Sequence, residues 1–266
     1  YAKIRERLAN KQPKAAKLSY AESIENGFKI DDNYVPPKPN TLGTQVLKNY
    51  PLETLVPYFD WTPFFISWSL AGKFPKILED EVVGEAATDL YNQAQIMLKD
   101  IIDNHRFDAR AVFGLYPAQR TGADTVSVFD ENGQNVTHTF EHLRQQSDKV
   151  TGKPNLSLAD YIKPSAQPED YLGGFTVSIF GAEELANEYK AKGDDYSAIL
   201  VQSLADRFAE AFAEHLHERI RKEFWGYKAD EVLDNEELIK EKYVGIRPAP
   251  GYPACPEQAE KAVLFD

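Results

Sequence analysis

The chain has 266 residues, of which 42% are hydrophobic and 27% charged, so it can bury a substantial core as one large domain or two small ones. Its 42 acidic and 30 basic side chains give a formal net charge of −12, which argues against nucleic acid or an anionic membrane as partner, because both attract a positive face. The single cysteine, Cys255, excludes an internal disulfide, and with five scattered histidines it makes no zinc-ligand spacing.

The start of the chain indicates a segment of a longer polypeptide. It begins at Tyr1 rather than at methionine, and it shows neither a signal peptide nor an apolar run near the roughly 20 residues that span a bilayer. We therefore expect a reducing, cytoplasmic setting. Ile4 and Leu8 lie at helical spacing before a Pro-rich passage at residues 35–39. We interpret residues 1–40 as a helical tether from a missing module, with ordered packing beginning near Leu42.

The next elements predict a core, a helix and a strand. Six aromatic side chains between residues 58 and 68 are too dense to be left in water, so we expect them in the core. Apolar positions from residue 85 to 103 suit an amphipathic helix. Residues 109–116 then form an apolar strand candidate.

A hairpin and another strand follow. Residues 125–129 and 135–140 alternate between apolar and polar side chains, and the sequence DENG between them supplies turn chemistry. Residues 171–180 form an apolar strand in which Gly173 and Gly174 mark a bulge or a close backbone approach.

The clearest element is a helix from about residue 196 to 225. Asp194 or Asp195 can cap it, and apolar residues recur every four positions as a stripe that faces the core: Leu204, Phe208, Phe212 and Leu216. Hairpins beside segregated long helices predict an α+β fold, a mainly antiparallel twisted sheet flanked by long helices in a single large domain. The absence of a GxGxxG fingerprint argues against a Rossmann-type methyltransferase.

The most informative segment is GIRPAPGYPACPE at residues 245–257. Proline fixes φ and glycine allows close backbone approach, so this loop holds an irregular backbone at little entropic cost. Its arginine, Arg247, can clamp a carboxylate or phosphate. The alternative is a rigid surface connection with a structural arginine.

Together with DWTPFF at residues 60–65, this loop resembles the C-terminal activation domain of cobalamin-dependent methionine synthase. Other segments resemble that family in the same order: WSLAGKFPKILEDEVVG from Trp68, HLRQQ from His142, DYLGGF from Asp170 and AEAFAEHLHERIRKEFWGY from Ala209. The resemblance covers most of the chain. Residues 41–266 are then the activation domain without its C-terminal end, since the family continues with a further aromatic-containing segment of the ligand site.

The resemblance implies a module that binds S-adenosylmethionine and supports reductive methylation of cob(II)alamin to methylcobalamin, within methionine biosynthesis. It implies as partners the cobalamin-binding module of the same polypeptide and an electron donor, flavodoxin or a flavoprotein reductase. Cobalamin and zinc would be bound by other modules of this methyltransferase, so this chain alone would not perform the full reaction.

The resemblance also implies the ligand-binding residues. Arg247 matches the arginine that pairs with the methionyl carboxylate, and Asp60 matches the aspartate that meets the amino group; the alternative for Asp60 is an N-cap, and both roles can coexist. Ala249, Gly251 and Tyr252 match the loop against the adenosyl group, mainly through backbone atoms. Two further acidic residues of the family pattern are Glu210 and Glu241, although helical periodicity places Glu210 on an ordinary solvated face.

We expect no catalytic side chain and no metal ligand, because the sulfonium is already an activated methyl donor. His215 and His217 point about 200° apart on a helix and cannot share a metal, and Cys255 has no activating base in the sequence. Two alternatives stay open: a module that docks on a cobalamin domain without binding a small molecule, and a free-standing S-adenosylmethionine enzyme.

Overall fold

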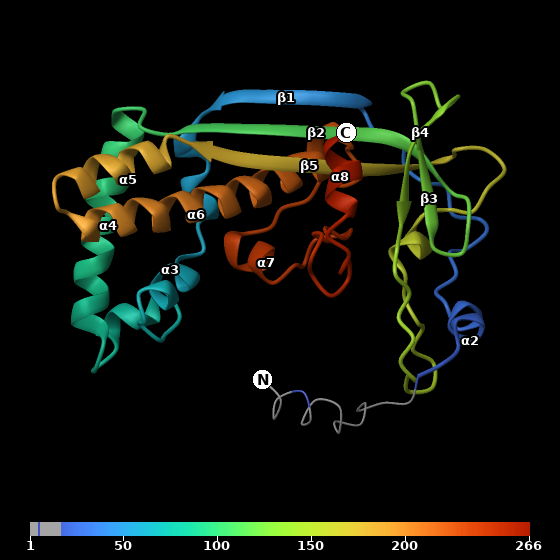
Figure 1. The fold of residues 1–266 in the computed structure, drawn as a ribbon, viewed down its shortest axis with the longest axis horizontal. Helices are drawn as coiled ribbons and strands as arrows, with labels where there is room; N and C mark the ends of the chain where they lie inside the picture. The colour runs from blue at the N-terminus through green and yellow to red at the C-terminus, as the bar shows by residue number, and fades with distance from the viewer. Residues whose placement is uncertain (1–4, 6–16) are drawn as a thin grey trace. The chain divides into compact units, whose positions relative to one another are not determined.

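A computed structural model describes Arg5 and residues 17–266, and it has the predicted α+β fold (Figure 1). The helices are α2 (Tyr20–Glu25), α3 (Trp61–Ser67), α4 (Gly84–Asp103), α5 (Ala182–Ala191), α6 (Asp195–Arg219), α7 (Asn235–Ile239) and α8 (Glu260–Phe265). The strands are β1 (Gly43–Tyr50), β2 (Asp108–Arg120), β3 (Thr125–Phe129), β4 (Val136–Glu141) and β5 (Asp170–Phe180). No helix of the described part is long and apolar enough to cross a membrane.

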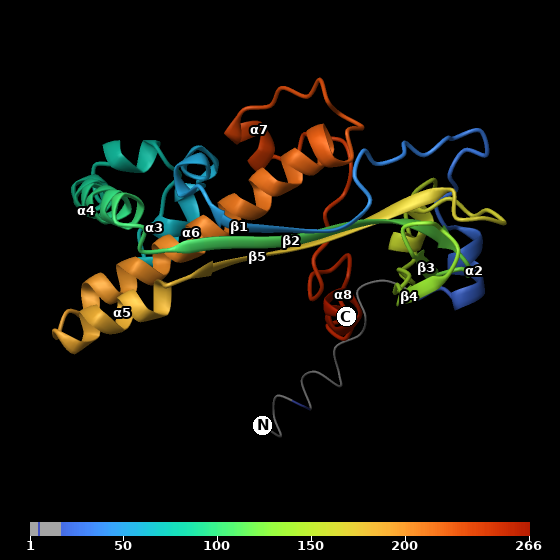
Figure 2. The same ribbon diagram turned by 90° about the horizontal axis from the view of Figure 1, so that it is seen from above.

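The five strands form one sheet in the order β1-β2-β3-β4, with β5 also pairing with β2. The three pairings along this path are antiparallel, as predicted. Val46 lies opposite Val112 between β1 and β2, and Val126 lies opposite Phe140 across the β3–β4 hairpin. Figure 2 shows β1, β2 and β5 running side by side.

The chain folds into two compact units, and two of the boundaries between them fall within β2 and β5. One, here called the hairpin unit, comprises the described residues up to Lys38, Tyr116–Leu172 and Arg247–Asp266. The other, here called the helical unit, comprises Pro39–Leu115 and Gly173–Ile246.

The core of the helical unit lies between the sheet and α3, α4 and α6. In this unit β2 buries every second side chain, namely Ala109, Ala111, Phe113 and Leu115. Of the predicted aromatic cluster, Phe59, Trp61, Phe64 and Phe65 are buried, whereas Tyr58 and Trp68 pack against the core partly exposed. The cluster is therefore core, as the sequence predicts.

The helix α6 confirms the strongest sequence prediction. Oδ1 of Asp194 accepts the N–H of Ser197 at 2.9 Å and caps the helix. The predicted stripe is buried, with each of Leu204, Phe208, Phe212 and Leu216 at 0% exposure. The helix ends at Arg219, earlier than predicted, because a π-helical turn, Ile220–Phe224, continues the chain.

The predicted helix at 85–103 and the predicted strands are also confirmed, with boundaries shifted by a few residues. Gly173 in β5 marks a close approach, since a Cβ there would meet Cδ2 of Leu115 at 2.6 Å. The strand β1 was not predicted. Its side chains alternate weakly, and Thr44, Lys48 and Asn49 are exposed, as expected for a strand with a partner on one side.

The helical spacing predicted around Ile4 and Leu8 lies outside the described residues apart from Arg5, so the tether over residues 1–40 remains a prediction. Residues 17–38 belong to the hairpin unit. Ser19 and Glu22 form a capping box at the start of α2. The hydroxyl of Tyr20 donates to Asp124 at 2.7 Å, and Ser23 is fully buried. Packing thus begins well before Leu42, where we expected it.

Candidate functional site

Asp60 lies at the N-terminus of α3 in the helical unit, half-buried. Its backbone is extended, and Oδ1 accepts the N–H of Thr62 at 2.9 Å, which confirms the predicted N-cap. The other carboxylate oxygen, Oδ2, accepts no hydrogen bond from the described residues. One carboxylate can therefore cap the helix with one oxygen and meet a cationic ligand with the other.

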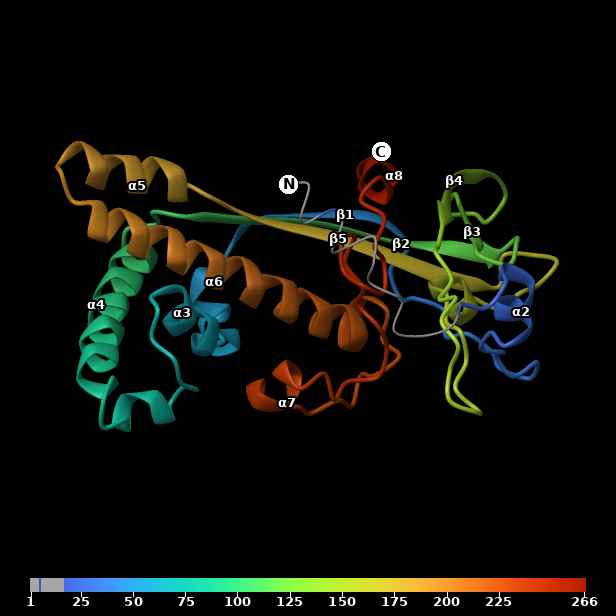
Figure 3. The ribbon, with the colours of Figure 1, turned by 60° about the horizontal axis from the view of Figure 1, so that its bottom comes forward.

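The turn that carries Asp60, just before α3, is held by side chains from α6 and α7, and Figure 3 labels all three helices. Nδ2 of Asn235 donates to the Phe59 carbonyl at 3.1 Å, and Nη1 of Arg207 donates to the Asp60 carbonyl at 3.5 Å. Neither Asn235 nor Arg207 was predicted as a site residue. The two contacts join residues that are 176 and 147 positions apart, so no local pattern predicts them. The one sequence signal is the capped motif DNEEL, which predicts a helix start at Asn235.

Glu210 and Glu241 belong to the same unit and are both exposed. Glu210 lies one turn beyond Arg207 on the solvated face of α6, as the periodicity predicts. Glu241 follows α7 with φ +54°, and its N–H donates to Leu238 at 2.9 Å. A left-handed residue just beyond a helix is usually glycine, so a glutamate there is a departure from the common pattern. Glu241 stays a candidate because of the family pattern.

The segment from Arg247 to Cys255 forms a tight loop in the hairpin unit. The N–H of Tyr252 donates to Ala249 at 3.1 Å, and the N–H of Gly251 donates to Cys255 at 2.7 Å. Gly251 has φ +101°, a left-handed backbone that favours glycine. Four of the predicted residues are thus brought together: Arg247, Ala249, Gly251 and Tyr252.

This loop presents both backbone and side-chain groups. The N–H of Ala249 has no hydrogen-bond partner among the described residues. Tyr252 is 67% exposed and Arg247 is half-buried. A donor N–H, an aromatic ring and a guanidinium within six positions can bind an anionic group and a flat ring.

The remaining titratable groups of the loop do not indicate nucleophilic catalysis. Burial raises the pKa of the Cys255 thiol, and the nearby Glu260 carboxylate raises it further. Because the thiolate is the nucleophile, a raised pKa makes this thiol a poor one. Glu260 itself has a raised pKa, caused mainly by burial.

The two histidines of α6 pack against different neighbours. Nε2 of His215 lies 2.8 Å from the Tyr50 hydroxyl, and Nδ1 of His217 lies 2.8 Å from Nη1 of Arg221. The described residues contain no cluster of three or more side chains that could hold a metal ion.

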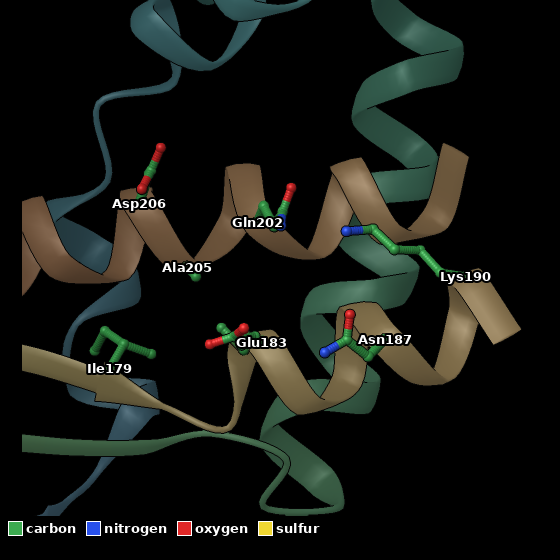
Figure 4. Close-up of a pocket in the computed structure, with 8 residues that line it drawn as sticks. Ile179, Glu183, Asn187, Lys190, Gln202, Ala205 and Asp206 are labelled. Atoms are coloured by element: carbon green, nitrogen blue, oxygen red, sulfur yellow. The ribbon is translucent and has the colours of Figure 1, made fainter. Parts of the chain in front are cut away.

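A shallow groove of about 380 Å³ lies between α5 and α6 of the helical unit (Figure 4). Its lining includes Glu183, Asn187 and Lys190 of α5 and Gln202 and Asp206 of α6. These five side chains are exposed, and no predicted site residue lines the groove. The groove therefore does not coincide with the candidate ligand-binding residues.

Comparison with known proteins agrees with the resemblance seen in the motifs. The family model "Vitamin B12 dependent methionine synthase, activation domain" matches residues 51–266. A solved structure, "Crystal Structure of the MetH Reactivation Domain bound to AdoHcy", is similar at 46% sequence identity and a TM-score of 0.88. That similarity covers 94% of this chain and 78% of the other. Both matches run through the hairpin unit and the helical unit.

Proposed function

This chain belongs to the family of vitamin B12 dependent methionine synthase activation domains, and we propose that it binds S-adenosylmethionine for reductive methylation of cob(II)alamin. The similar solved structure is bound to AdoHcy, which is S-adenosylmethionine without its transferable methyl group. The single observation that carries the proposal is the Asp60 carboxylate, which caps α3 through Oδ1 and keeps Oδ2 available.

The ligand offers a carboxylate, an ammonium group and an adenosine, and the proposed residues match these groups chemically. Arg247 pairs with the carboxylate through its planar guanidinium, and Asp60 accepts a hydrogen bond from the ammonium. The N–H of Ala249 and the backbone at Gly251 and Tyr252 contact the adenosyl part. Gly251 fits this role because only glycine readily adopts the loop's φ of +101°.

Glu210 and Glu241 are proposed as further acidic contacts on the ligand's cationic side. Both are exposed in the helical unit, and the described residues give neither side chain an ion pair or hydrogen bond. A carboxylate without a protein partner is available to a cationic ligand. An ion pair this exposed contributes only about 0–1 kcal/mol, so we assign both a smaller share than Asp60.

When bound, S-adenosylmethionine supplies a methyl group already activated by its sulfonium. The chain's share is to bind, orient and shield that group, which requires no general base. We propose that the methylated cobalt is held by a cobalamin-binding module of the same polypeptide and that flavodoxin or a flavoprotein reductase supplies the electron. The chain by itself would then not complete the methyltransferase reaction. We also propose a cytoplasmic location, which is supported by the lone cysteine.

The test is a calorimetric titration of S-adenosylmethionine into this chain, with S-adenosylhomocysteine and ATP as comparison ligands. We expect saturable binding of the first two, and binding at least tenfold weaker in Arg247→Ala, since a hydrogen-bonded charged partner contributes about 1.5–3 kcal/mol. Arg110→Ala is the matched control, because Arg110 is an exposed arginine engaged with Asp108 on β2.

Two outcomes would contradict the proposal. If Arg247→Ala bound as tightly as the unmodified chain, the role of Arg247 would be wrong. If the chain gave no saturable binding while its melting transition stayed intact, the ligand module would be refuted in favour of a docking module without a small-molecule site.

A further inference from the structure

Two consecutive backbone carbonyls, those of Phe59 and Asp60, are held by side chains from distant helices. The bond from Asn235 to Phe59, at 3.1 Å, has an ordinary length for N–H···O. The bond from Arg207 to Asp60, at 3.5 Å, is long and therefore weak. Asn235 is thus the stronger of the two external restraints on the turn that aims the Asp60 carboxylate.

Asn235 is itself well anchored. It is the first residue of α7, next to the N-cap Asp234, whose Oδ1 accepts the N–H of Glu237 at 2.8 Å. In return the Glu237 carboxylate accepts the N–H of Asp234 at 3.3 Å, and Leu238 in the following position is 2% exposed. A capping box and a buried leucine therefore fix the position from which the Asn235 amide reaches Phe59.

The side-chain amide of Asn235 makes a hydrogen bond through its nitrogen but not through its oxygen. Its Oδ1 is enclosed and has no hydrogen-bond partner among the described residues, while its Nδ2 donates to Phe59. An enclosed carbonyl without a partner lowers stability, and an apolar residue at this position would avoid that cost. The hydrogen bond that Nδ2 donates to the Phe59 carbonyl therefore explains why asparagine occupies this position.

We propose that Asn235 is a positioning residue for Asp60. By holding the Phe59 carbonyl, it fixes the backbone on which the Asp60 side chain is mounted. With Oδ1 bonded to Thr62, Oδ2 then has a set direction toward the ammonium group of S-adenosylmethionine. This inference rests on the role of Asp60 given under the proposed function, and it names a residue of α7 that the ligand need not touch.

The first test is a double-mutant cycle with S-adenosylmethionine as the titrated ligand. We expect Asn235→Ala to weaken binding roughly 3- to 10-fold, the size that one neutral hydrogen bond contributes. In the Asp60→Asn background the same substitution should have little further effect, because Asn235 acts through Asp60. Equal losses of affinity in both backgrounds would overturn the inference.

A matched control separates positioning from simple destabilisation of α7. Glu237→Ala removes one half of the capping box and leaves the Asn235 amide in place. It should lower the stability of α7 while changing the dissociation constant less than twofold. If Glu237→Ala weakened binding as much as Asn235→Ala, the effect would belong to α7 as a whole and the inference would be wrong.

A ligand-free measurement keeps this inference distinguishable from the proposed function. Amide hydrogen exchange at Thr62 reports the bond that Oδ1 of Asp60 accepts. We expect faster exchange at Thr62 in Asn235→Ala and not in Glu237→Ala. Unchanged exchange would refute the positioning role even if the chain binds S-adenosylmethionine. Faster exchange in a chain that binds no ligand would leave the positioning of Asp60 correct and the proposed function wrong.

Discussion

Asp60 can be divided experimentally into its two roles, because asparagine and alanine differ as N-caps. Asparagine caps a helix about as well as aspartate, whereas alanine costs about 1 kcal/mol. Asp60→Asn should therefore unfold at nearly the same urea concentration as the unmodified chain. Asp60→Ala should lose about 1 kcal/mol of unfolding free energy, since Oδ1 no longer accepts the Thr62 N–H at 2.9 Å.

The affinity for S-adenosylmethionine should respond differently from stability. Both substitutions remove the charge that faces the ligand's ammonium group, and a hydrogen bond to a charged group contributes about 1.5–3 kcal/mol. This corresponds to binding about 10- to 150-fold weaker. Because Asp60 is half-buried and partly screened by water, we expect a value in the lower half of that range for Asp60→Asn.

Urea unfolding and calorimetric titration of the same samples provide the assay. Asp194→Ala is a matched control, because Asp194 caps α6 by accepting the Ser197 N–H at 2.9 Å and lies outside the proposed ligand contacts. It should lower stability and leave affinity unchanged. If Asp60→Asn bound the ligand normally and Asp60→Ala only destabilised the fold, Asp60 would be a helix cap alone and the reasoning from Oδ2 would be refuted.

Three further predictions concern the loop, the core and the response to pH. Gly251→Ala should weaken S-adenosylmethionine binding, because forcing an L residue to φ +101° costs about 1–3 kcal/mol; Gly152→Ala, at φ +86° with open space around it, is the control in calorimetry. Phe212→Ala, at 0% exposure, should lower the unfolding free energy by about 3–5 kcal/mol, measured in urea. Burial lowers the pKa of His215 below its ordinary 6.5 in the folded chain, and the positive charge of Arg219 lowers it further. The unfolded chain therefore binds a proton at this histidine more readily than the folded chain does. Stability should accordingly fall as pH drops below about 6.5, with a shallower fall in His215→Asn; identical pH slopes would contradict this assignment.

Much of the fold is encoded locally and could be predicted. The four-residue stripe of α6 and the alternating strands of the hairpin follow from the periods of the helix and the strand, whatever packs against them. The caps at Asp60 and Asp194 depend on atoms two or three residues away, so their signal lies within the sequence window. The proline loop is likewise a local feature, since proline and glycine set its backbone directly.

Other features depend on contacts between distant residues. Arg221 reads in the sequence as a charged residue at a helix end, yet it is fully buried. Its Nη2 lies 2.6 Å from Oε1 of Glu231, and its guanidinium lies 4.3 Å from the centre of the Tyr243 ring. A charged group is buried in this way only where partners meet it, and these two partners come from the segments that follow the helix. Its burial therefore could not be predicted from the helical pattern.

The secondary-structure elements, the helix caps and the family motifs could thus be predicted, because each depends on neighbours within a few positions. Long-range packing sets which side chains restrain the Asp60 turn, leaves Oδ2 of Asp60 without a hydrogen bond among the described residues, and brings Asn235 to the Phe59 carbonyl. These features could not be predicted, because a hydrogen bond between residues 176 positions apart leaves no periodic pattern in the chain. It exists only once packing has brought α3 and α7 together.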